Sequence, residues 1–313
     1  MSDRPDPAEL AALAAAVPAG IHFGTSSWTY PGWKGLVYQQ DYPKTGATAR
    51  MLAEYARYPL FSTVGIDSTF YNPASVNVLR SYAEALPPGF RCVSKVWDRV
   101  TVHTFPKQRY KTGGGEENPD FLNPEVFRRD VLDPCLEHFA DHVGPFVFEF
   151  QTIGRAAGFT AQAFADRLDA FFTKLPREAM YAVELRNPEF LTPPYFAVLR
   201  EHNVAHTFNS WTRMPPVGEQ LALPGSLSAL FTVARILLRP GRTYNEAVDA
   251  FAPYDTIHDK NPDLRADVVR LIEQAVNLRI PAYILVNNRA EGSAPLTIAA
   301  LARLLRDRVA TAG

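Results

Sequence analysis

Charged residues recur late in several strand-like segments of this 313-residue chain. The stretch YAVELRNPEF, residues 181 to 190, is rich in β-favouring residues and ends at Asn-Pro, yet it contains Glu184 and Arg186. Because residues two apart in a strand share a face, both charges lie on the face of Ala182. Acidic and basic groups held together can transfer protons or stabilise developing charge. The stretch therefore predicts a polar site near the end of a strand.

The same alternation places a charged residue late in four further segments. These residues are Asp67 in 62–68, Lys95 in 90–96, Glu149 in 145–151 and Arg235 in 230–237. We predict Lys95, Glu149, Glu184 and Asp67 as catalytic residues. A lysine in such a place could bind an anion, form a Schiff base or act as a base.

Three acidic and three basic side chains in one place also have a purely structural interpretation, a satisfied ion-pair network that closes the site. Glu149 and Glu184 fall on neighbouring strands, so their backbones should lie about 4.8 Å apart. The two carboxylates could be acid and base, share a divalent cation, or pair with Lys95 and Arg186. A retaining glycosidase needs two carboxyl groups roughly 5 Å apart, although Arg235 stands where a strand-seven carboxylate would be expected.

Metal and cofactor signals are weak. The seven histidines show no HxH or HExxH spacing, and Cys92 and Cys135 form no zinc motif. No cofactor is predicted, and Mg²⁺ held by Asp67 with Glu149 or Glu184 stays open.

Three loops carry further candidates. Trp28, Tyr30 and Trp33 crowd the segment after the first strand, as a stacking wall or as a hydrophobic plug. The long segment 97–125 contains a basic patch that could contact phosphate or be a solvated loop; the patch comprises Lys107, Arg109, Tyr110 and Lys111 beside Gly113, Gly114 and Gly115. Asn287 and Asn288 offer amide donors after the last strand, and Gly292 with the following helix start could bind an anion.

The elements that must position these residues alternate along the chain. Helix-period segments separate most of eight short β-rich runs, at 21–25, 62–68, 90–96, 145–151, 181–186, 203–209, 230–237 and 282–288. One such helical segment spans 124–143, whereas the segment 210–225 after the sixth run is predicted to be irregular. Such alternation predicts a single α/β (β/α)8 TIM-like barrel over 21–313, after an N-terminal extension over 1–20 containing a small surface helix. An open doubly wound sheet would need a Gly-rich phosphate turn after the first strand. In a barrel, late inward residues form the floor of the active-site cup.

Composition limits the possible partners. The net charge is -1, which gives no general attraction to nucleic acid or anionic lipid, so a nucleic-acid role would need a local patch. No stretch approaches the roughly 20 apolar residues of a membrane helix. We expect a cytoplasmic protein with a small-molecule ligand, no membrane partner and an oligomeric state that the sequence leaves open.

Six motifs in order resemble those of the DUF72 (YecE-like) family: GTSSWTYPGWKGLVY, IDSTFYNP, FRCVSKV, FVFEFQ, AVELRNPEF and ILVNNRAEGSAP. The resemblance covers residues 21 to about 307 and implies a TIM-like barrel with no assigned activity. It carries the family pattern onto Thr25, Trp28, Tyr30, Trp33, Thr69, Phe70, Tyr71, Lys95, Glu184, Arg186, Arg235, Asn287, Asn288 and Gly292. Many members have Glu-x-Asn where this chain has Gly65 and Asp67, and Gln where it has Glu149.

These signals together predict a barrel-mouth site for a small polar, anionic ligand that is phosphorylated or sugar-like, with possible hydrolase or lyase activity. A non-catalytic ligand- or nucleic-acid-binding protein and a glycosidase-like enzyme are the alternatives. The predicted substrate-binding residues are Thr25, Trp28, Tyr30, Trp33, Thr69, Tyr71, Arg186, Asn209, Arg235, Asn287 and Asn288.

Overall fold

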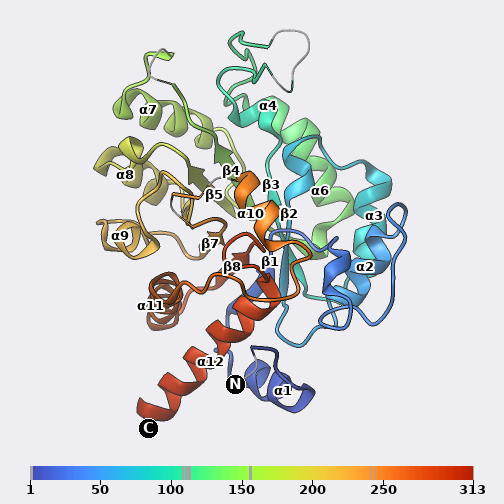
Figure 1. The fold of residues 1–313 in the computed structure, drawn as a ribbon. Helices are drawn as coiled ribbons and strands as arrows, with labels where there is room; N and C mark the ends of the chain where they lie inside the picture. The colour runs from blue at the N-terminus through green and yellow to red at the C-terminus, as the bar shows by residue number, and fades with distance from the viewer. Residues whose placement is uncertain are drawn as a thin grey trace.

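The eight predicted strands form one parallel barrel sheet. A computed structural model describes residues 3–107, 109, 114–154, 157–239, 241–242 and 244–312. Hydrogen-bonded neighbours follow the order β1-β8-β7-β6-β5-β4-β3-β2, with helices outside the strands, which confirms the predicted (β/α)8 barrel (Figure 1). The strands are β1 Ile21–Thr25, β2 Thr63–Ile66, β3 Arg91–Lys95, β4 Val143–Phe150, β5 Tyr181–Leu185, β6 Ala205–Asn209, β7 Thr232–Ile236 and β8 Ala282–Val286.

Helices follow most strands, and several begin at side-chain caps. Asp6, Ser75, Thr160 and Asn261 each accept a hydrogen bond from a first-turn backbone N–H of α1, α3, α7 and α11, respectively. The α-helices are α1 Pro7–Ala16, α2 Thr48–Tyr55, α3 Val76–Ala85, α4 Asp98–Thr101, α5 Pro124–Phe127, α6 Asp133–His138, α7 Ala161–Phe172, α8 Pro193–Glu201, α9 Val217–Ala222, α10 Tyr244–Phe251, α11 Pro262–Leu278 and α12 Ala294–Ala312. None of the described helices has the length and apolar character needed to cross a membrane.

Three helical details differ from the sequence expectation. The single helix expected over 124–143 is instead α5, a π-helical turn over Arg128–Leu132, and α6. Pro134 lacks a backbone N–H and its ring crowds the preceding turn, which a widened turn accommodates. The segment expected to be irregular after β6 contains α9, and the connection after β7 contains α10.

The barrel interior below the mouth is apolar. Inward side chains of six strands form one cluster, which comprises Val93, Val147, Ala182, Ala205, Val233, Tyr283 and Leu285 with Ala229 and Phe231. The opposite faces, such as Phe146 and Phe148 of β4, pack in the larger core with the helices. The predicted alternation of these strands is therefore correct, and the charged side chains Asp67, Lys95, Glu149, Glu184, Arg186 and Arg235 lie above this layer.

The barrel is closed between β1 and β2 with help from a side chain of α2. The Tyr55 hydroxyl accepts a hydrogen bond from Thr25 N at 2.9 Å and donates one to Thr63 O at 3.1 Å. Gly24 allows the close approach, because a Cβ there would lie 2.0 Å from Thr63 O. Tyr55 thus bridges a backbone donor of one strand and an acceptor of the next.

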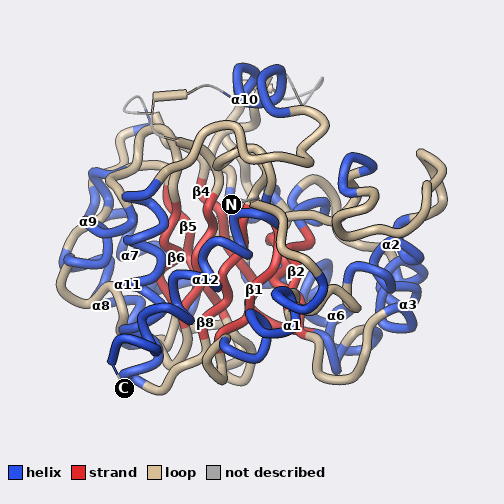
Figure 2. Tube along the Cα trace, turned by 60° about the horizontal axis from the view of Figure 1, so that its bottom comes forward, coloured by secondary structure: helices blue, strands red, loops and turns tan. Residues whose placement is uncertain are grey.

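The connection from β7 to α11 covers the barrel mouth. Figure 2 shows α10, which belongs to this connection, above the ends of the strands. Tyr254 meets Tyr30 of the β1 loop edge-on with ring centroids 5.5 Å apart, and a Cβ at Gly32 would collide with Pro253 O. Segments more than two hundred residues apart in sequence therefore pack together at the rim.

Candidate functional site

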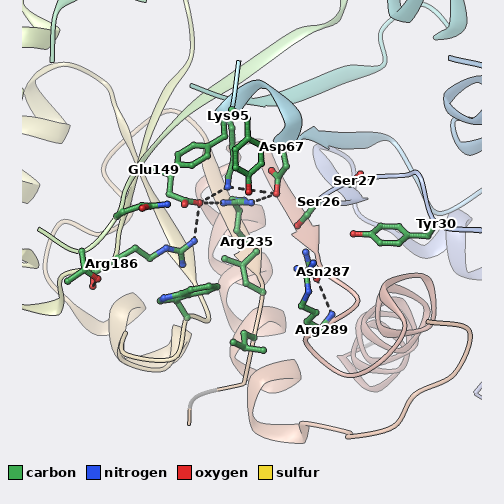
Figure 3. Close-up of a pocket in the computed structure, with 17 residues that line it drawn as sticks. Ser26, Ser27, Tyr30, Asp67, Lys95, Glu149, Arg186, Arg235, Asn287 and Arg289 are labelled. Atoms are coloured by element: carbon green, nitrogen blue, oxygen red, sulfur yellow. Dashed lines mark hydrogen bonds and ion pairs between the residues drawn. The ribbon is translucent and has the colours of Figure 1, made fainter. Parts of the chain in front are cut away.

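The predicted charged residues converge at the carboxyl ends of the strands. Lys95 ends β3, Asp67 directly follows β2, and Arg186 directly follows β5. Glu149 and Glu184 are register partners across β4 and β5, as predicted. Figure 3 shows Lys95, Asp67, Glu149 and Arg186 around Arg235 of β7.

Arg235 is the centre of the ion-pair network. Its Nη1 lies 2.5 Å from a Glu184 oxygen and 2.9 Å from a Glu149 oxygen, and its Nη2 lies 2.7 Å from Asp67. Burial opposes the charge of Arg235, but Asp67, Glu184 and Glu149 together raise its pKa above the ordinary value. One guanidinium therefore ties three carboxylates from three strands.

Glu149 is held by three cations at one oxygen. Its Oε2 lies 2.8 Å from Lys95 Nζ, 2.9 Å from Arg235 Nη1 and 3.0 Å from Arg186 Nη2. Burial alone would raise the pKa of Glu149, but Lys95, Arg186 and Arg235 outweigh it and hold that pKa well below the ordinary value of 4.5. Glu149 is therefore a permanent carboxylate near neutral pH and a poor general acid.

Arg186 is fixed from both sides. Its Nη2 lies 2.5 Å from Glu184 Oε1, a charge contact without hydrogen-bond alignment, and Nη1 donates to Asn209 Oδ1 at 3.4 Å. Its guanidinium also lies 4.1 Å from the ring centroid of Trp211. This stacking keeps the cation in place at the wall of the site.

Lys95 is the cation of this network with the most exposed side chain. Its ammonium lies 2.8 Å from Glu149, 3.9 Å from Asp67 and 4.6 Å from the ring centroid of Phe70. Its side chain is 12% exposed, against 6% for Arg186 and 2% for Arg235. An ammonium has three donors, so Lys95 can reach a ligand while it keeps Glu149.

A cavity of about 600 Å³ lies above the network. Polar, charged and aromatic side chains make up most of its wall, and Leu237 and Leu238 add apolar surface. The lining residues are Ser26, Ser27, Tyr30, Asp67, Phe70, Tyr71, Lys95, Glu149, Gln151, Thr152, Arg186, Trp211, Arg235, Leu237, Leu238, Asn287 and Arg289.

The structure brings about half of the predicted site residues to this cavity. Those that line it are Asp67, Lys95, Glu149, Tyr30, Tyr71, Arg186, Arg235 and Asn287. Those that do not line it are Glu184, Thr25, Trp28, Trp33, Thr69, Asn209 and Asn288. Glu184 is fully buried behind Arg235 and supports the network from below.

Three predicted residues of β1 and its loop face the protein instead of the cavity. Thr25 contacts Tyr55 of α2, because the inward positions of β1 are His22, Gly24 and Ser26. Trp28 donates from Nε1 to Thr48 O at 2.9 Å, and Trp33 is fully buried. The two tryptophans belong to the hydrophobic core, as in the hydrophobic-plug interpretation. Of these three aromatic residues, Tyr30 alone lines the cavity.

The remaining displaced residues have internal partners. Thr69 Oγ1 lies 2.6 Å from both Ile66 O and Lys95 O, and Asn209 Nδ2 donates to Leu185 O at 3.2 Å. Asn288 Oδ1 accepts from Ala294 N at 2.8 Å and so caps α12. Gly292 packs under the segment 256–258, where a Cβ would collide with Thr256 O. The anion site expected at this helix start is therefore occupied by protein.

Several lining residues were not predicted. Ser26 is two residues after Gly24 and shares the inward face of β1. The sequence analysis chose Thr25, which lies on the opposite face, and therefore did not include Ser26. Gln151 shares the face of Glu149 by the same alternation. Trp211 and Arg289 lie in loops without periodicity, so the sequence offered no signal for their direction.

The network occupies the position that a metal ion would need. The described residues contain no group of three or more His, Cys, Asp or Glu side chains that could hold a metal. Asp67, Glu149 and Glu184 point their oxygens at Arg235, whose guanidinium stands where the suggested Mg²⁺ would bind. The donor set therefore does not fit a magnesium site.

Arg109, one residue of the basic patch after β3, contacts residues at the edge of the cavity. Arg109 Nη1 lies 2.7 Å from the buried carboxylate of Asp98, and its guanidinium lies 4.8 Å from the Tyr71 ring centroid. Tyr110, Lys111 and Gly113 lie outside the described residues. Arg109 thus holds Tyr71 at the edge of the cavity.

Fold and site together define a (β/α)8 barrel protein with a cavity lined by charged side chains at the carboxyl end of its strands. The chain belongs to the DUF72 family, whose model, described as a protein of unknown function, matches residues 22–312. A DUF72 family protein of known structure from Thermotoga maritima is 17% identical, covers 91% of this chain and 98% of its own, and superposes with a TM-score of 0.59. A second, from Enterococcus faecalis, is 16% identical, covers 92% and 95%, and also has a TM-score of 0.59. No functionally curated protein matches the chain.

Proposed function

We propose that the cavity at the barrel mouth binds a small polar anion that carries a phosphate or carboxylate group. The supporting observation is Lys95, which lines the cavity, has the most exposed side chain of the three cations of the network and keeps donors beyond its contact with Glu149. Arg186 and Arg235 line the cavity next to it. A phosphate or carboxylate at Lys95 would make a charge-assisted hydrogen bond in this partly desolvated site.

The rest of the wall favours a sugar-like body for this anion. A volume of about 600 Å³ suits a small molecule, since ligand pockets commonly span roughly 300–1,000 Å³. Tyr30, Phe70 and Trp211 offer apolar faces, and Ser27, Gln151 and Thr152 offer hydrogen-bonding groups. The net charge of -1 gives no support to a general nucleic-acid role.

Any hydrolase or lyase step in this cavity would depend on Lys95 and Asp67. Both line the cavity, and Asp67 keeps 27% of its side chain exposed. Glu149 is locked as a carboxylate, and Glu184 does not reach the cavity. The paired-carboxylate glycosidase alternative therefore receives no support from the geometry, because one carboxyl group of such a pair must act as an acid at the sugar.

Thermal shift with matched variants tests the proposed anion site. Wild type, Lys95→Met and the surface control Lys34→Met are screened against sugar phosphates, sugar acids, inorganic phosphate and neutral sugars. A ligand at a hundred times its Kd adds about 2.7 kcal/mol to stability. We expect an anion to stabilise wild type and Lys34→Met while Lys95→Met loses most of the shift. No stabilisation by any anion, or an equal shift in Lys95→Met, would contradict the proposal.

Turnover is tested once a stabilising anion is found. Product formation with a bell-shaped pH dependence, lost in both Lys95→Met and Asp67→Asn, would show an enzyme. Binding that survives Asp67→Asn without any product would show a ligand-binding protein.

A further inference from the structure

One buried hydroxyl on the cavity wall has no partner. Ser26 lies just after β1, is 1% exposed, and its Oγ makes no hydrogen bond within the described part of the chain. Seven buried side-chain hydroxyls in the described residues share this property, and Ser26 alone among them lines the cavity. Because an unpaired buried hydroxyl costs free energy, a ligand that pairs with it gains affinity.

Asn287 presents a second unused group beside Ser26. Ser26 N donates to Val286 O at 3.1 Å, which places Ser26 next to the end of β8. Asn287 Oδ1 accepts from Arg289 N at 3.0 Å and from Arg289 Nη1 at 3.3 Å, so the amide orientation is fixed. Its Nδ2 has no partner among the described residues and therefore offers donors to the cavity that Asn287 lines.

These two groups lie across the cavity from most of the charges. The strand order puts β1 and β8 about half a barrel away from β4 and β5. Figure 3 shows Ser26 and Asn287 on one side, Glu149 and Arg186 on the other, and Arg235 between them. We call Ser26 and Asn287 the neutral wall, and we call Lys95, Glu149 and Arg186, together with the central Arg235, the charged wall.

We propose that Ser26 and Asn287 form a hydroxyl-binding subsite and that the ligand is a hydroxylated anion spanning both walls. This inference rests on the proposed anion site and adds the group at the other end of the ligand. The Asn287 Nδ2 group only donates, whereas the Ser26 hydroxyl both donates and accepts. A ligand hydroxyl can accept from Asn287 and exchange a hydrogen bond with Ser26, and sugar acids and sugar phosphates carry such a group together with an anion.

Pairs of probes separate hydroxyl recognition from anion binding. Gluconate is compared with hexanoate, and glucose 6-phosphate with hexyl phosphate, by calorimetry on wild type, Ser26→Ala and Asn287→Ala. Thr207→Val is the matched control, since Thr207 is a buried inward residue of β6 with an unpartnered hydroxyl that does not line the cavity. Sorbitol reports on hydroxyl recognition without charge.

In wild type we expect a hydroxylated probe to bind at least about tenfold more tightly than its alkyl partner, which corresponds to roughly 1.4 kcal/mol. Ser26→Ala and Asn287→Ala should each remove most of this preference and leave the alkyl anion unchanged. Thr207→Val should alter neither. The Tm of ligand-free Ser26→Ala should equal or exceed that of wild type, which excludes misfolding as the cause.

The outcomes distinguish the two proposals. Equal binding of hydroxylated and alkyl anions, unchanged in Ser26→Ala, would overturn the hydroxyl subsite and leave the anion site standing. Sorbitol binding that Ser26→Ala abolishes, with no binding of any anion, would support the subsite and overturn the anion site. Binding of none of the probes to wild type would overturn both.

Discussion

The two walls of the cavity differ in how their polar groups are satisfied. On the charged wall, Glu149 Oε2 meets three cations within 3.0 Å. On the neutral wall, Ser26 Oγ and Asn287 Nδ2 have no partner in the described residues. The difference indicates that the charged wall contributes to folding without a ligand, whereas the proposed ligand would supply the missing partners of the neutral wall.

The largest expected effect comes from removing the centre of the charged wall. Arg235→Met leaves Asp67, Glu149 and Glu184 near one another without their shared cation, and breaking a buried ion pair costs about 3–5 kcal/mol. Urea denaturation measures the free energy of unfolding. Arg308→Met is the control, because its pair with Glu273 is exposed and should contribute less than about 1 kcal/mol. Equal losses for the two variants would contradict the account.

Glu149→Gln should show the next largest effect and a defined pH dependence. The variant keeps the side-chain volume but leaves Lys95, Arg186 and Arg235 short of one counter-charge, so we expect a loss of about 3 kcal/mol near neutral pH. The pKa of Glu149 is depressed in the folded state, so its stabilisation is present above the unfolded pKa and is lost as pH falls through the folded pKa. The gap between wild type and variant should therefore shrink well below pH 4.5. A gap that widens in acid would contradict this assignment.

A smaller loss is expected where the neutral wall joins the rest of the barrel. Tyr55→Phe removes the hydroxyl between Thr25 N and Thr63 O and should cost about 1–2 kcal/mol, because both groups are buried. Hydrogen exchange at the Thr25 amide should become faster. Tyr58→Phe is the control, since it removes the hydroxyl of a second buried tyrosine of the same core. Similar losses in the two variants would remove the bridging role of Tyr55.

The smallest effect is expected on the neutral wall itself. Ser26→Ala removes a hydroxyl that has no partner, so the free energy of unfolding without ligand should stay within about 0.5 kcal/mol of wild type or rise. The same urea series measures it. A loss above about 1 kcal/mol would show that Ser26 has a structural role, and would contradict the statement that the neutral wall contributes little to folding.

Much of the fold was predictable because it depends on periodicity. The alternation put Val147 and Glu149 on one face of β4 and Glu184 on the inward face of the neighbouring strand, where the structure makes it the register partner of Glu149. Pro134 shows the limit, since a proline marks a disturbed helix without specifying a π-helical turn. The short helices α9 and α10 were missed because such segments depend on tertiary contacts more than on their own pattern.

The candidate site was predictable on its strands and much less so in its loops. Lys95 and Arg235 follow from strand parity, which is a backbone property. Trp28 and Trp33 were assigned to a ligand wall, but aromatic residues suit a protein core as well as a ligand-stacking surface, and both tryptophans lie in the core. The direction of a loop side chain is set by partners far away in the sequence, as Tyr254 packs against Tyr30. The prediction that Thr25 faces the site was wrong for a different reason. The inward residue of β1 beside it is Gly24, which has no side chain, so hydrophobicity does not reveal which face of the strand points inward.

A crystal structure with the most stabilising hydroxylated anion of the screen would test the proposed two-walled ligand site. We expect electron density in the cavity with the acidic group beside Lys95 and a ligand hydroxyl about 3 Å from Ser26 Oγ and Asn287 Nδ2. A ligand bound outside this cavity, or one whose acidic group sits at Ser26 and Asn287 with no contact to Lys95, would contradict it.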